Sequence, residues 1–380
     1  MKEPIWLKGE MFMGAERKLQ IGMIGVGWRA HGYMRVVREL GNRMEISGVY
    51  VRSQESADRM EKEFPGRVDQ DLDAFMNRSH DFVMVLVPRE CALFYLEKLL
   101  QNHIPVLMET PPGNGIEELK KCYELKQKYD GKVQVAEQYF LQPYHRAVMQ
   151  AVSDGMLGTV SHMEIAMIHD YHGISIMRKV LGTGFQNCKI RGRQFDFPVQ
   201  FHCGRDGMHA EEKLVSDFRK RADFVFENGK VGFFDFSEEQ YFNYFRTRHM
   251  NVRGEKGEIY DTQMAVAGED GVPVTGTLVR DDLGQYSNLE GYGLRGLGWN
   301  GKVLYHNPYW EEGARLSDDE IAMAGLLDGM CRYVHGGEEI YPLEEALQDT
   351  YLYLMMDEAI RSGREIETFS QVWSPSFGQE

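Results

Sequence analysis

The stretch Leu19-Gln-Ile-Gly-Met-Ile-Gly-Val-Gly-Trp-Arg-Ala30 decides the fold class of this chain. An apolar run ends in a GxGxxA pattern, which is typical of a strand, a glycine turn and the start of a helix. The first glycine permits the tight turn and the second lets the backbone approach a pyrophosphate, which then meets free N–H groups at the helix N-terminus. We therefore predict that Gly25, Gly27, Trp28 and Arg29 bind a dinucleotide.

The same alternation of short apolar runs and amphipathic segments continues to about residue 140. The runs expected to form strands are Leu19–Val26, Met44–Val51, Phe82–Val87, Val106–Met108 and Val133–Ala136, and the segments expected to form helices are 30–40, 56–63, 90–101 and 116–128. Nearly continuous apolar strands that alternate with helices are typical of a parallel sheet covered on both faces. We predict a Rossmann dinucleotide-binding domain, a doubly wound parallel sheet, over residues 15–140.

Beyond residue 141 the pattern changes to long extended segments. They cover 160–168, 223–227, 231–237 and 247–260, and Asn228-Gly229 between two of them is a strong hairpin signal. Helices are expected over 144–153, 317–334 and 342–361, with Ser317 as an N-cap, and irregular or hairpin structure over 262–315. Residues 141–380 are therefore predicted to form an α+β domain with a mostly antiparallel sheet.

Composition narrows the class of protein. The net charge of -15 argues against a nucleic-acid partner, and no apolar run approaches the length of about 18 residues that a membrane span needs. The first ten residues lack the apolar core of a signal peptide, and the five cysteines are scattered, which is typical of reduced thiols in the cytoplasm. His202, Cys203 and His209 do not have the spacing of a zinc site, so we predict no metal.

The end of the second expected strand favours NADP over NAD as the cofactor. A site specific for NAD usually carries an acidic residue there to bind the ribose 2′-hydroxyl. This chain has Arg52 and Ser53 instead, which suit a 2′-phosphate by charge and by hydrogen bonding. Alternatively, Arg52 stacks on the adenine or is simply solvated.

Polar residues follow the later strands at their carboxyl ends, the edge at which ligands bind in an open α/β sheet. Pro88 ends one strand, Glu109-Thr110 follows the next, and Gln138 and Tyr139 follow the last. We expect Pro88, Thr110 and Gln138 to bind the cofactor and Tyr139 to line the substrate pocket.

The densest group of acid–base residues is His169-Asp170-Tyr171-His172, at the end of an expected strand. On a strand, Asp170 and His172 would share a face, so that Asp170 could bind substrate or orient the imidazole; a turn there would bring both histidines together instead. His172 and His169 are candidates for proton transfer and Tyr171 for proton donation. Arg178 could hold a substrate hydroxyl or carboxylate, although a salt bridge is the alternative.

The order of motifs resembles the Gfo/Idh/MocA oxidoreductases, the family of glucose–fructose oxidoreductase and inositol dehydrogenase. The matching pieces are Gly22-Met-Ile-Gly-Val-Gly27, Asp81-Phe-Val-Met-Val-Leu-Val-Pro88, Pro105-Val-Leu-Met-Glu-Thr-Pro-Pro112, Val135-Ala-Glu-Gln-Tyr139, His172-Gly-Ile-Ser-Ile-Met-Arg-Lys-Val-Leu-Gly182, Val252-Arg-Gly-Glu-Lys-Gly-Glu-Ile259 and Tyr341-Pro-Leu-Glu-Glu-Ala-Leu-Gln-Asp349. The resemblance implies a large open sheet in the second domain, a nicotinamide cofactor, and a sugar, polyol or related substrate. It also implies Glu109 beside the nicotinamide ribose, His172 as the catalytic histidine, and a homodimer or homotetramer formed through the sheet.

The chain departs from the family pattern at the residues that do chemistry. The family's Glu-Lys-Pro lysine falls on Thr110, and the aspartate expected four residues before His172 falls on Ile168. Ser175 and Phe140 stand where the family commonly has an aspartate and an arginine. A threonine hydroxyl cannot accept a proton as a lysine of lowered pKa can, so the chain is expected to be an atypical branch.

Three functions fit these observations. The first is an NAD(P)-dependent oxidoreductase that transfers hydride between nicotinamide and a sugar, inositol or sugar-derived substrate. The second is a redox-neutral lyase, glycosidase or epimerase that keeps its cofactor, which the loss of the lysine at Thr110 would permit. The third is a non-catalytic NAD(P)-binding sensor, against which the clustered histidines argue.

Overall fold

The computed structural model describes residues 17–204, 207–283, 293–375 and 377–378. The chain forms two compact units, each built from separated stretches of sequence. Unit 1 contains the residues up to 146 together with 280–297 and 305–347, and unit 2 contains 147–279, 298–304 and the residues from 348 onward. The predicted domain boundary at residue 140 stays a prediction, because the two compact units do not divide the chain at a single position.

Unit 1 contains a six-stranded parallel sheet in the order β3-β2-β1-β4-β5-β6. Its strands are β1 (Leu19–Ile24), β2 (Met44–Tyr50), β3 (Val68–Asp69), β4 (Phe82–Val85), β5 (Val106–Met108) and β6 (Val133–Val135), and its helices are α1 (Trp28–Glu39), α2 (Gln54–Glu63), α3 (Leu72–Met76), α4 (Arg89–Gln101) and α5 (Ile116–Lys128). The strands β4, β5 and β6 are buried throughout, because helices cover the sheet. The predicted Rossmann sheet is confirmed; only β3 and α3 were missed, because they are too short for a periodic pattern.

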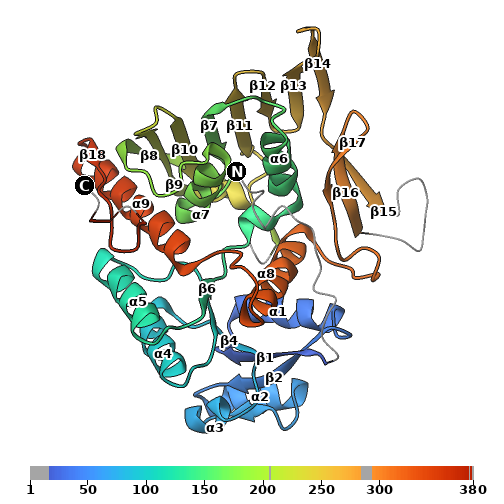
Figure 1. Cartoon of the computed structure of the whole chain (residues 1–380), viewed down its shortest axis with the longest axis vertical. Coiled ribbons are helices and arrows are strands. Elements are labelled where there is room, and N and C mark those ends of the chain that lie inside the picture. Colours follow the sequence, from blue (N-terminus) through green and yellow to red (C-terminus); the bar gives the residue numbers. More distant parts are fainter. Residues whose placement is uncertain (1–16, 205–206, 284–292, 376, 379–380) are drawn as a thin grey trace. The chain divides into compact units, whose positions relative to one another are not determined.

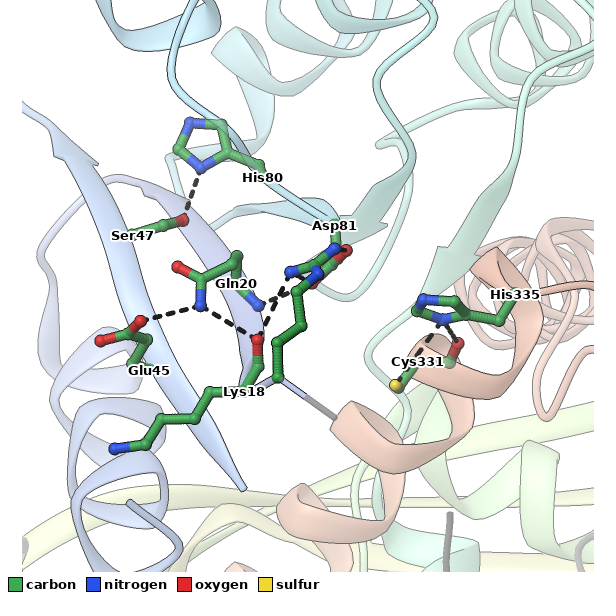
Figure 2. Close-up of polar contacts among 9 residues, drawn as sticks. Lys18, Gln20, Glu45, Ser47, His80, Asp81, Cys331 and His335 are labelled. Atoms are coloured by element: carbon green, nitrogen blue, oxygen red, sulfur yellow. Dashed lines mark hydrogen bonds and ion pairs between the residues drawn. The ribbon is translucent and has the colours of Figure 1, made fainter. Parts of the chain in front are cut away.

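Polar contacts fix the edge of this sheet where the strands begin. The Gln20 backbone N–H donates to Asp81 at 2.7 Å, the Gln20 amide donates to Glu45 at 2.8 Å, and Ser47 lies 2.6 Å from the His80 ring (Figure 2). These contacts join β1, β2 and the start of β4. Asp81, Glu45 and His80 therefore have structural partners at this edge. The opposite edge, where the strands end, is the candidate for ligand binding.

A late helix, α8 (Asp318–Val334), completes unit 1. Ser317 is its N-cap in a capping box with Glu320, as predicted. The end of the Met323 side chain lies 3.0 Å from the position that a Cβ on Gly32 of α1 would take, so the two helices pack closely at this glycine. The packing of α8 on α1 therefore places the acidic start of α8 beside the start of α1.

Unit 2 is built on a nine-stranded sheet in the order β14-β13-β12-β11-β7-β10-β9-β8-β18. The strands are β7 (Val160–Ala166), β8 (Cys188–Gly204), β9 (Gly207–Phe226), β10 (Val231–Ser237), β11 (His249–Gly254), β12 (Gly257–Tyr260), β13 (Gln263–Ala267), β14 (Pro273–Thr277) and β18 (Ile366–Glu367). Only β7 and β10 pair in parallel, so the predicted large, mostly antiparallel sheet is confirmed. Figure 1 shows α7 (Asp170–Leu181) and α9 (Leu343–Ser362) on one face of it.

The remaining elements complete the chain. They are α6 (Pro143–Ser153), the short 3-10 helices η2 (Tyr139–Leu141) and η3 (Glu238–Tyr241), and a three-stranded sheet of β15 (Val279–Leu283), β16 (Gly293–Trp299) and β17 (Lys302–His306). The hairpin predicted at Asn228-Gly229 joins β9 to β10. The long segment expected over 247–260 is instead a second hairpin, β11 and β12, because Glu255-Lys256 forms a turn.

The expectation that His169 to His172 continue a strand is wrong. The strand β7 ends at Ala166, and helix α7 begins at Asp170 with His169 as its N-cap residue. Asp170 and His172 therefore do not share one face of a strand; they lie in the first turn of a helix. Gly173 lies against the Ile168 carbonyl and Phe234, where a Cβ would come within 2.9 Å of either, so the chain can turn sharply here.

Candidate functional site

The glycine turn lies at the carboxyl end of β1, as the motif requires. Gly25 has a φ of +97°, and a Cβ on it would lie 2.3 Å from the Leu86 carbonyl oxygen. This residue must therefore be glycine for two independent reasons, backbone conformation and the approach of the chain after β4. Gly27 is the N-cap of α1 with φ −71°, and a Cβ there would meet nothing within 4 Å. The space before Gly27 is thus open at the start of a helix, where N–H groups favour an anion.

Arg29 holds two carboxylates at this edge of unit 1. Its guanidinium lies 3.2 Å from Asp319 of α8 and 4.0 Å from Glu109 at the end of β5. The amides of Gln138 and Gln142 each donate to Asp319 at 3.2 Å. One cation and two amides therefore tie together the starts of α1 and α8 and the ends of β5 and β6.

Two buried polar atoms in this cluster lack a partner within the described residues. They are Glu109 Oε2 and the Tyr33 hydroxyl. Burial raises the pKa of Glu109, although the charge of Arg29 opposes the shift, and burial followed by the Glu109 charge raises the pKa of Tyr33. A buried acceptor without a donor costs about 1–3 kcal/mol, so Glu109 Oε2 is suited to accept a hydrogen bond from a bound ligand.

The other expected cofactor residues lie around the same edge. Arg52 and Ser53 follow β2 and are exposed, and the Ser53 hydroxyl caps α2 by accepting the Ser56 N–H at 3.2 Å. Pro88 is the exposed N-cap residue of α4 after β4, and the Thr110 hydroxyl donates to Glu109 at 3.3 Å.

Gln138 is buried at the start of η2, in contact with Asp319 as described above. Tyr139 is half-buried in η2, and its carbonyl lies 2.6 Å from the His145 ring. The structure thus places the expected cofactor residues where successive strands of unit 1 end, and Tyr139 with them.

Unit 2 contains a separate cavity of about 510 Å³. It is lined by acid–base residues, aromatic rings and one lysine: His169, Asp170, Phe201, Cys203, Gly204, Ser216, Asp217, Phe218, Lys220, Phe236, Glu238, Glu239, Tyr241 and Phe242. Its walls come from the start of α7, from β8, β9 and β10, and from η3. Aromatic walls with a few convergent polar groups are typical of small-molecule sites.

His169 and Asp170 form a pair at this cavity. His169 Nδ1 lies 3.2 Å from Asp170 Oδ2, and both side chains are partly exposed. Asp170 has a φ of +47°, an uncommon conformation for a residue other than glycine, and such strain is concentrated at functional sites. Burial opposes ionisation of Asp170, but the hydrogen bond from His169 and the charge of Lys220 outweigh it, so the pKa of Asp170 lies below its ordinary value.

The second histidine of the motif lies behind the first. The ring centroid of His172 is 4.8 Å from that of His169 and 4.3 Å from that of Tyr171. His172 and Tyr171 are both buried, and neither is among the residues that line the cavity, whereas His169 is. The structure thus brings the two histidines together, and it is His169 that faces the open space.

Arg178 has a structural contact in place of the substrate contact expected for it. Its side chain is buried and forms an ion pair with Asp349 at 2.5 Å. Its remaining donors reach the Gly184 carbonyl at 2.9 and 2.5 Å. A guanidinium with these partners is directed into the packing of α7 against α9, so we correct its assignment to a structural residue.

Two residues of these clusters have no local signal in the sequence. Asp319 is separated from Arg29 by 290 residues, and Lys220 is separated from Asp170 by 50. Lys220 lies within β9 (Gly207–Phe226), of which only the end, from residue 223, was expected as an extended segment. The strand pattern of the segment 207–226 could have placed a lysine on the sheet, but only the tertiary pairing of β9 with β10 brings it to α7.

The N-terminal segment has a family match. Residues 19–137 match the GFO_IDH_MocA family model, described as an oxidoreductase family with an NAD-binding Rossmann fold. The YteT protein of Bacillus subtilis (strain 168) is 30% identical over 100 residues, which are 26% of this chain and 23% of YteT. The chain thus aligns with about a quarter of the length of this curated relative.

Solved structures extend the likeness in fold to both units. An oxidoreductase from Agrobacterium radiobacter, solved in complex with NAD+, L-tartaric acid and magnesium, is 15% identical with a TM-score of 0.68, over 92% of this chain and 98% of that one. A scyllo-inositol dehydrogenase from Lactobacillus casei is 14% identical with a TM-score of 0.63, over 93% and 99% of the two chains. At this identity the likeness establishes the fold, a Rossmann sheet followed by a large, mostly antiparallel sheet.

Two features of the described residues bear on other kinds of site. None of their helices is long and apolar enough to cross a membrane. Nor do the parts of the chain that the structure describes contain a group of three or more His, Cys, Asp or Glu side chains able to hold a metal ion.

Proposed function

We propose that the whole chain is a Gfo/Idh/MocA oxidoreductase of an atypical branch, which transfers hydride between NAD(P) and a sugar, inositol or related polyol. The observation that carries the proposal is the Gly25–Gly27 turn, open at the start of α1, within the segment that matches the family model. The buried and unpartnered Glu109 Oε2 supports it, because a ribose hydroxyl is the kind of donor that this acceptor needs.

Residues of unit 1 would hold the cofactor. The N–H groups at the start of α1 would bind the pyrophosphate, Glu109 and Gln138 would lie toward the nicotinamide riboside, and Trp28, Arg29, Pro88 and Thr110 would line the remaining edge. Arg52 and Ser53 favour the 2′-phosphate of NADP, since an exposed guanidinium after β2 attracts an anion. Bound NAD(P) supplies hydride transfer at the nicotinamide C4.

Residues of unit 2 would bind the substrate and hold its hydroxyl proton. With Nδ1 of His169 donating to Asp170, the neutral ring has Nε2 as its acceptor, and the ring lines the cavity. His169 is therefore our first candidate to accept the proton of the reacting hydroxyl. His172 and Tyr171, packed behind it, would fix its ring, and Tyr241, whose ring lies 5.6 Å from that of His169, would help to bind the sugar.

The assembly and location of the protein are also proposed. The face of the nine-stranded sheet away from α7 and α9 exposes Phe195 and Val225, at 49% and 42%, and we propose that it pairs two or four copies of the chain. All five cysteines are free, which fits work in the reducing cytoplasm. Light scattering on the purified protein tests the oligomer, and a monomer at all concentrations would contradict it.

The function is tested with NADH and NADPH titrations followed by a panel of sugars and polyols, with absorbance of reduced nicotinamide as the readout. The His169→Gln variant should bind cofactor normally and lose about 10²–10⁴-fold in kcat. The His162→Gln variant, on β7 of the same unit, is the matched control and should retain activity.

Two results would contradict the proposal. Absence of binding to either dinucleotide would contradict the cofactor site. Product formation with solvent deuterium incorporated, and with no net change in reduced nicotinamide, would establish the redox-neutral alternative in place of net oxidation.

A further inference from the structure

A lysine faces the same cavity as the His169–Asp170 pair. Lys220 projects from β9, and its Nζ lies 3.5 Å from Asp170 Oδ1 and 2.8 Å from Asp357 Oδ1 of α9. The other oxygen of Asp170, Oδ2, is the one that contacts His169 Nδ1. The Asp170 carboxylate is therefore shared, with one oxygen on the imidazole and the other on the ammonium.

Burial strengthens the interaction between the charges of Lys220 and Asp170. The side chain of Lys220 is only 16% exposed, and that of Asp170 only 24%. Burial lowers the pKa of Lys220, but the charges of Asp170 and Asp357 reverse the shift and raise it above its ordinary value. A partly buried ammonium between two carboxylates stays charged. Removing one member of the ion pair would leave the other as a buried, uncompensated charge and would lower the stability of the protein.

The strained backbone of Asp170 shows that this geometry has a cost. A residue other than glycine at a φ of +47° persists where surrounding contacts hold it. Here those contacts are the side-chain bonds of Asp170 to His169 and Lys220. Lys220 is itself fixed by Asp357 and by the aromatic rings of Phe218 and Tyr353, at 5.8 and 5.6 Å from its Nζ.

We propose that Lys220 is a positioning residue of the unit 2 site, which holds Asp170 ionised and oriented so that His169 presents Nε2 as an acceptor to the cavity. The inference rests on the proposed function and adds a residue to its site. Lys220 acts through Asp170: a fixed carboxylate accepts a hydrogen bond from Nδ1–H, which keeps the proton on Nδ1 and so sets the tautomer of the ring. Without the ammonium, Asp170 would take up a proton more readily and would no longer hold the imidazole.

The titratable and charged groups around the pair come from four elements. Tyr171 and His172 lie on α7 with Asp170, Tyr241 comes from η3, Lys220 from β9, and Asp357 with Tyr353 from α9. Lys220 is the cation in ion-pair contact with Asp170 among the described residues. Its removal should therefore dominate any change in the titration of Asp170.

The Lys220→Met variant tests this role against Lys189→Met, an exposed lysine on β8 that pairs with Glu367 at 3.9 Å. The activity-independent readout is the ¹³C-carboxyl titration of Asp170, assigned from the resonance that Asp170→Asn removes. In Lys220→Met the pKa of Asp170 should rise by about one unit, because one close opposite charge is lost. Lys220→Arg should keep the wild-type titration, and Lys189→Met should not change it.

Turnover supplies the second readout. The acid limb of the kcat/KM profile should move to higher pH in Lys220→Met, because His169 loses a nearby positive charge that disfavours its own protonation, and Lys220→Arg should restore it. If Lys220→Met does not fold, Asp357→Asn serves instead: the ammonium loses its second carboxylate and interacts more strongly with Asp170, so the pKa of Asp170 should fall, and an unchanged titration would overturn the role of Lys220.

The outcomes separate the two proposals. An unchanged Asp170 titration in folded Lys220→Met would overturn the role of Lys220. A shifted titration in a protein that turns over no polyol would support the positioning role and overturn the proposed function instead.

Discussion

The two glycines of the nucleotide turn should fail in different ways when each is replaced by alanine. At Gly25 a non-glycine residue at φ +97° costs about 1–3 kcal/mol. Its Cβ would also lie 2.3 Å from the Leu86 oxygen, whereas ordinary contacts begin at 3.4 Å, so the ends of β1 and β4 would have to separate by about 1 Å. Overpacking of this kind costs a further amount of about 1–3 kcal/mol.

Gly25→Ala should therefore lower the free energy of unfolding by about 2–6 kcal/mol, the sum of the two costs. For a folding unit of this size that is a fall of about 10 °C in Tm. Gly27→Ala should behave differently, because the backbone there is ordinary and the space is open. Alanine is a poorer N-cap than glycine, so its cost should be about 1 kcal/mol or less.

The order of the two variants should be reversed for cofactor affinity: Gly27→Ala, the milder change for stability, should be the more harmful one for binding. The methyl group of Gly27→Ala would stand where the pyrophosphate approaches α1, and NAD(P)H affinity should fall at least about tenfold, or 1.4 kcal/mol. Fluorescence titration measures it, with the exposed Trp28 beside the turn as an intrinsic reporter. Wild-type affinity in a folded Gly27→Ala variant would refute the assignment of this turn to the pyrophosphate, and an unchanged Tm in Gly25→Ala would refute the steric argument.

Three further predictions test other parts of the structure. Arg52→Asp should lower NADPH affinity about tenfold or more, because the 2′-phosphate of NADPH loses its guanidinium partner. NADH has no 2′-phosphate, so its affinity should be nearly unchanged; equal losses for the two cofactors in parallel titrations would contradict the prediction. Arg178→Met should cost about 3–5 kcal/mol in chemical denaturation, because it removes the ion-pair partner of the buried Asp349, and Arg178→Met with Asp349→Leu should cost less than the single change; additive losses would argue against the pair. Burial lowers the pKa of His145 to about 4, against a bond to the Tyr139 carbonyl that raises it. The contribution of neutral His145 to stability is thus complete above the unfolded pKa of about 6.5 and declines by about 3 kcal/mol as the pH falls toward 4. Denaturant titrations at several pH values should show this decline in the wild type, and His145→Gln should remove it. The same pH dependence of stability in both proteins would disprove the prediction.

The sequence alone determined the parallel sheet and its ligand edge. Near-continuous apolar runs must be buried on both faces, and a glycine at position 25 followed by one at 27 marks where the chain turns from β1 into α1. Both signals are local, so they could be recognised without the fold. The N-cap at Ser317 and the hairpin at Asn228-Gly229 were predictable for the same reason.

The tertiary structure decided which side chains meet. The first turn of α7 replaced an expected strand because the strand pattern of β7 ends at Ala166, and a helix start brings His169 beside Asp170 where a strand would have alternated them. Arg178 is buried in an ion pair with Asp349, and the pairing of β9 with β10 brings Lys220 to Asp170. Charge partners 50 to 290 residues apart are chosen by packing and leave no periodic trace. Composition and spacing could therefore locate the glycine turn, while the partners of Arg29 and Asp170 had to come from the folded chain.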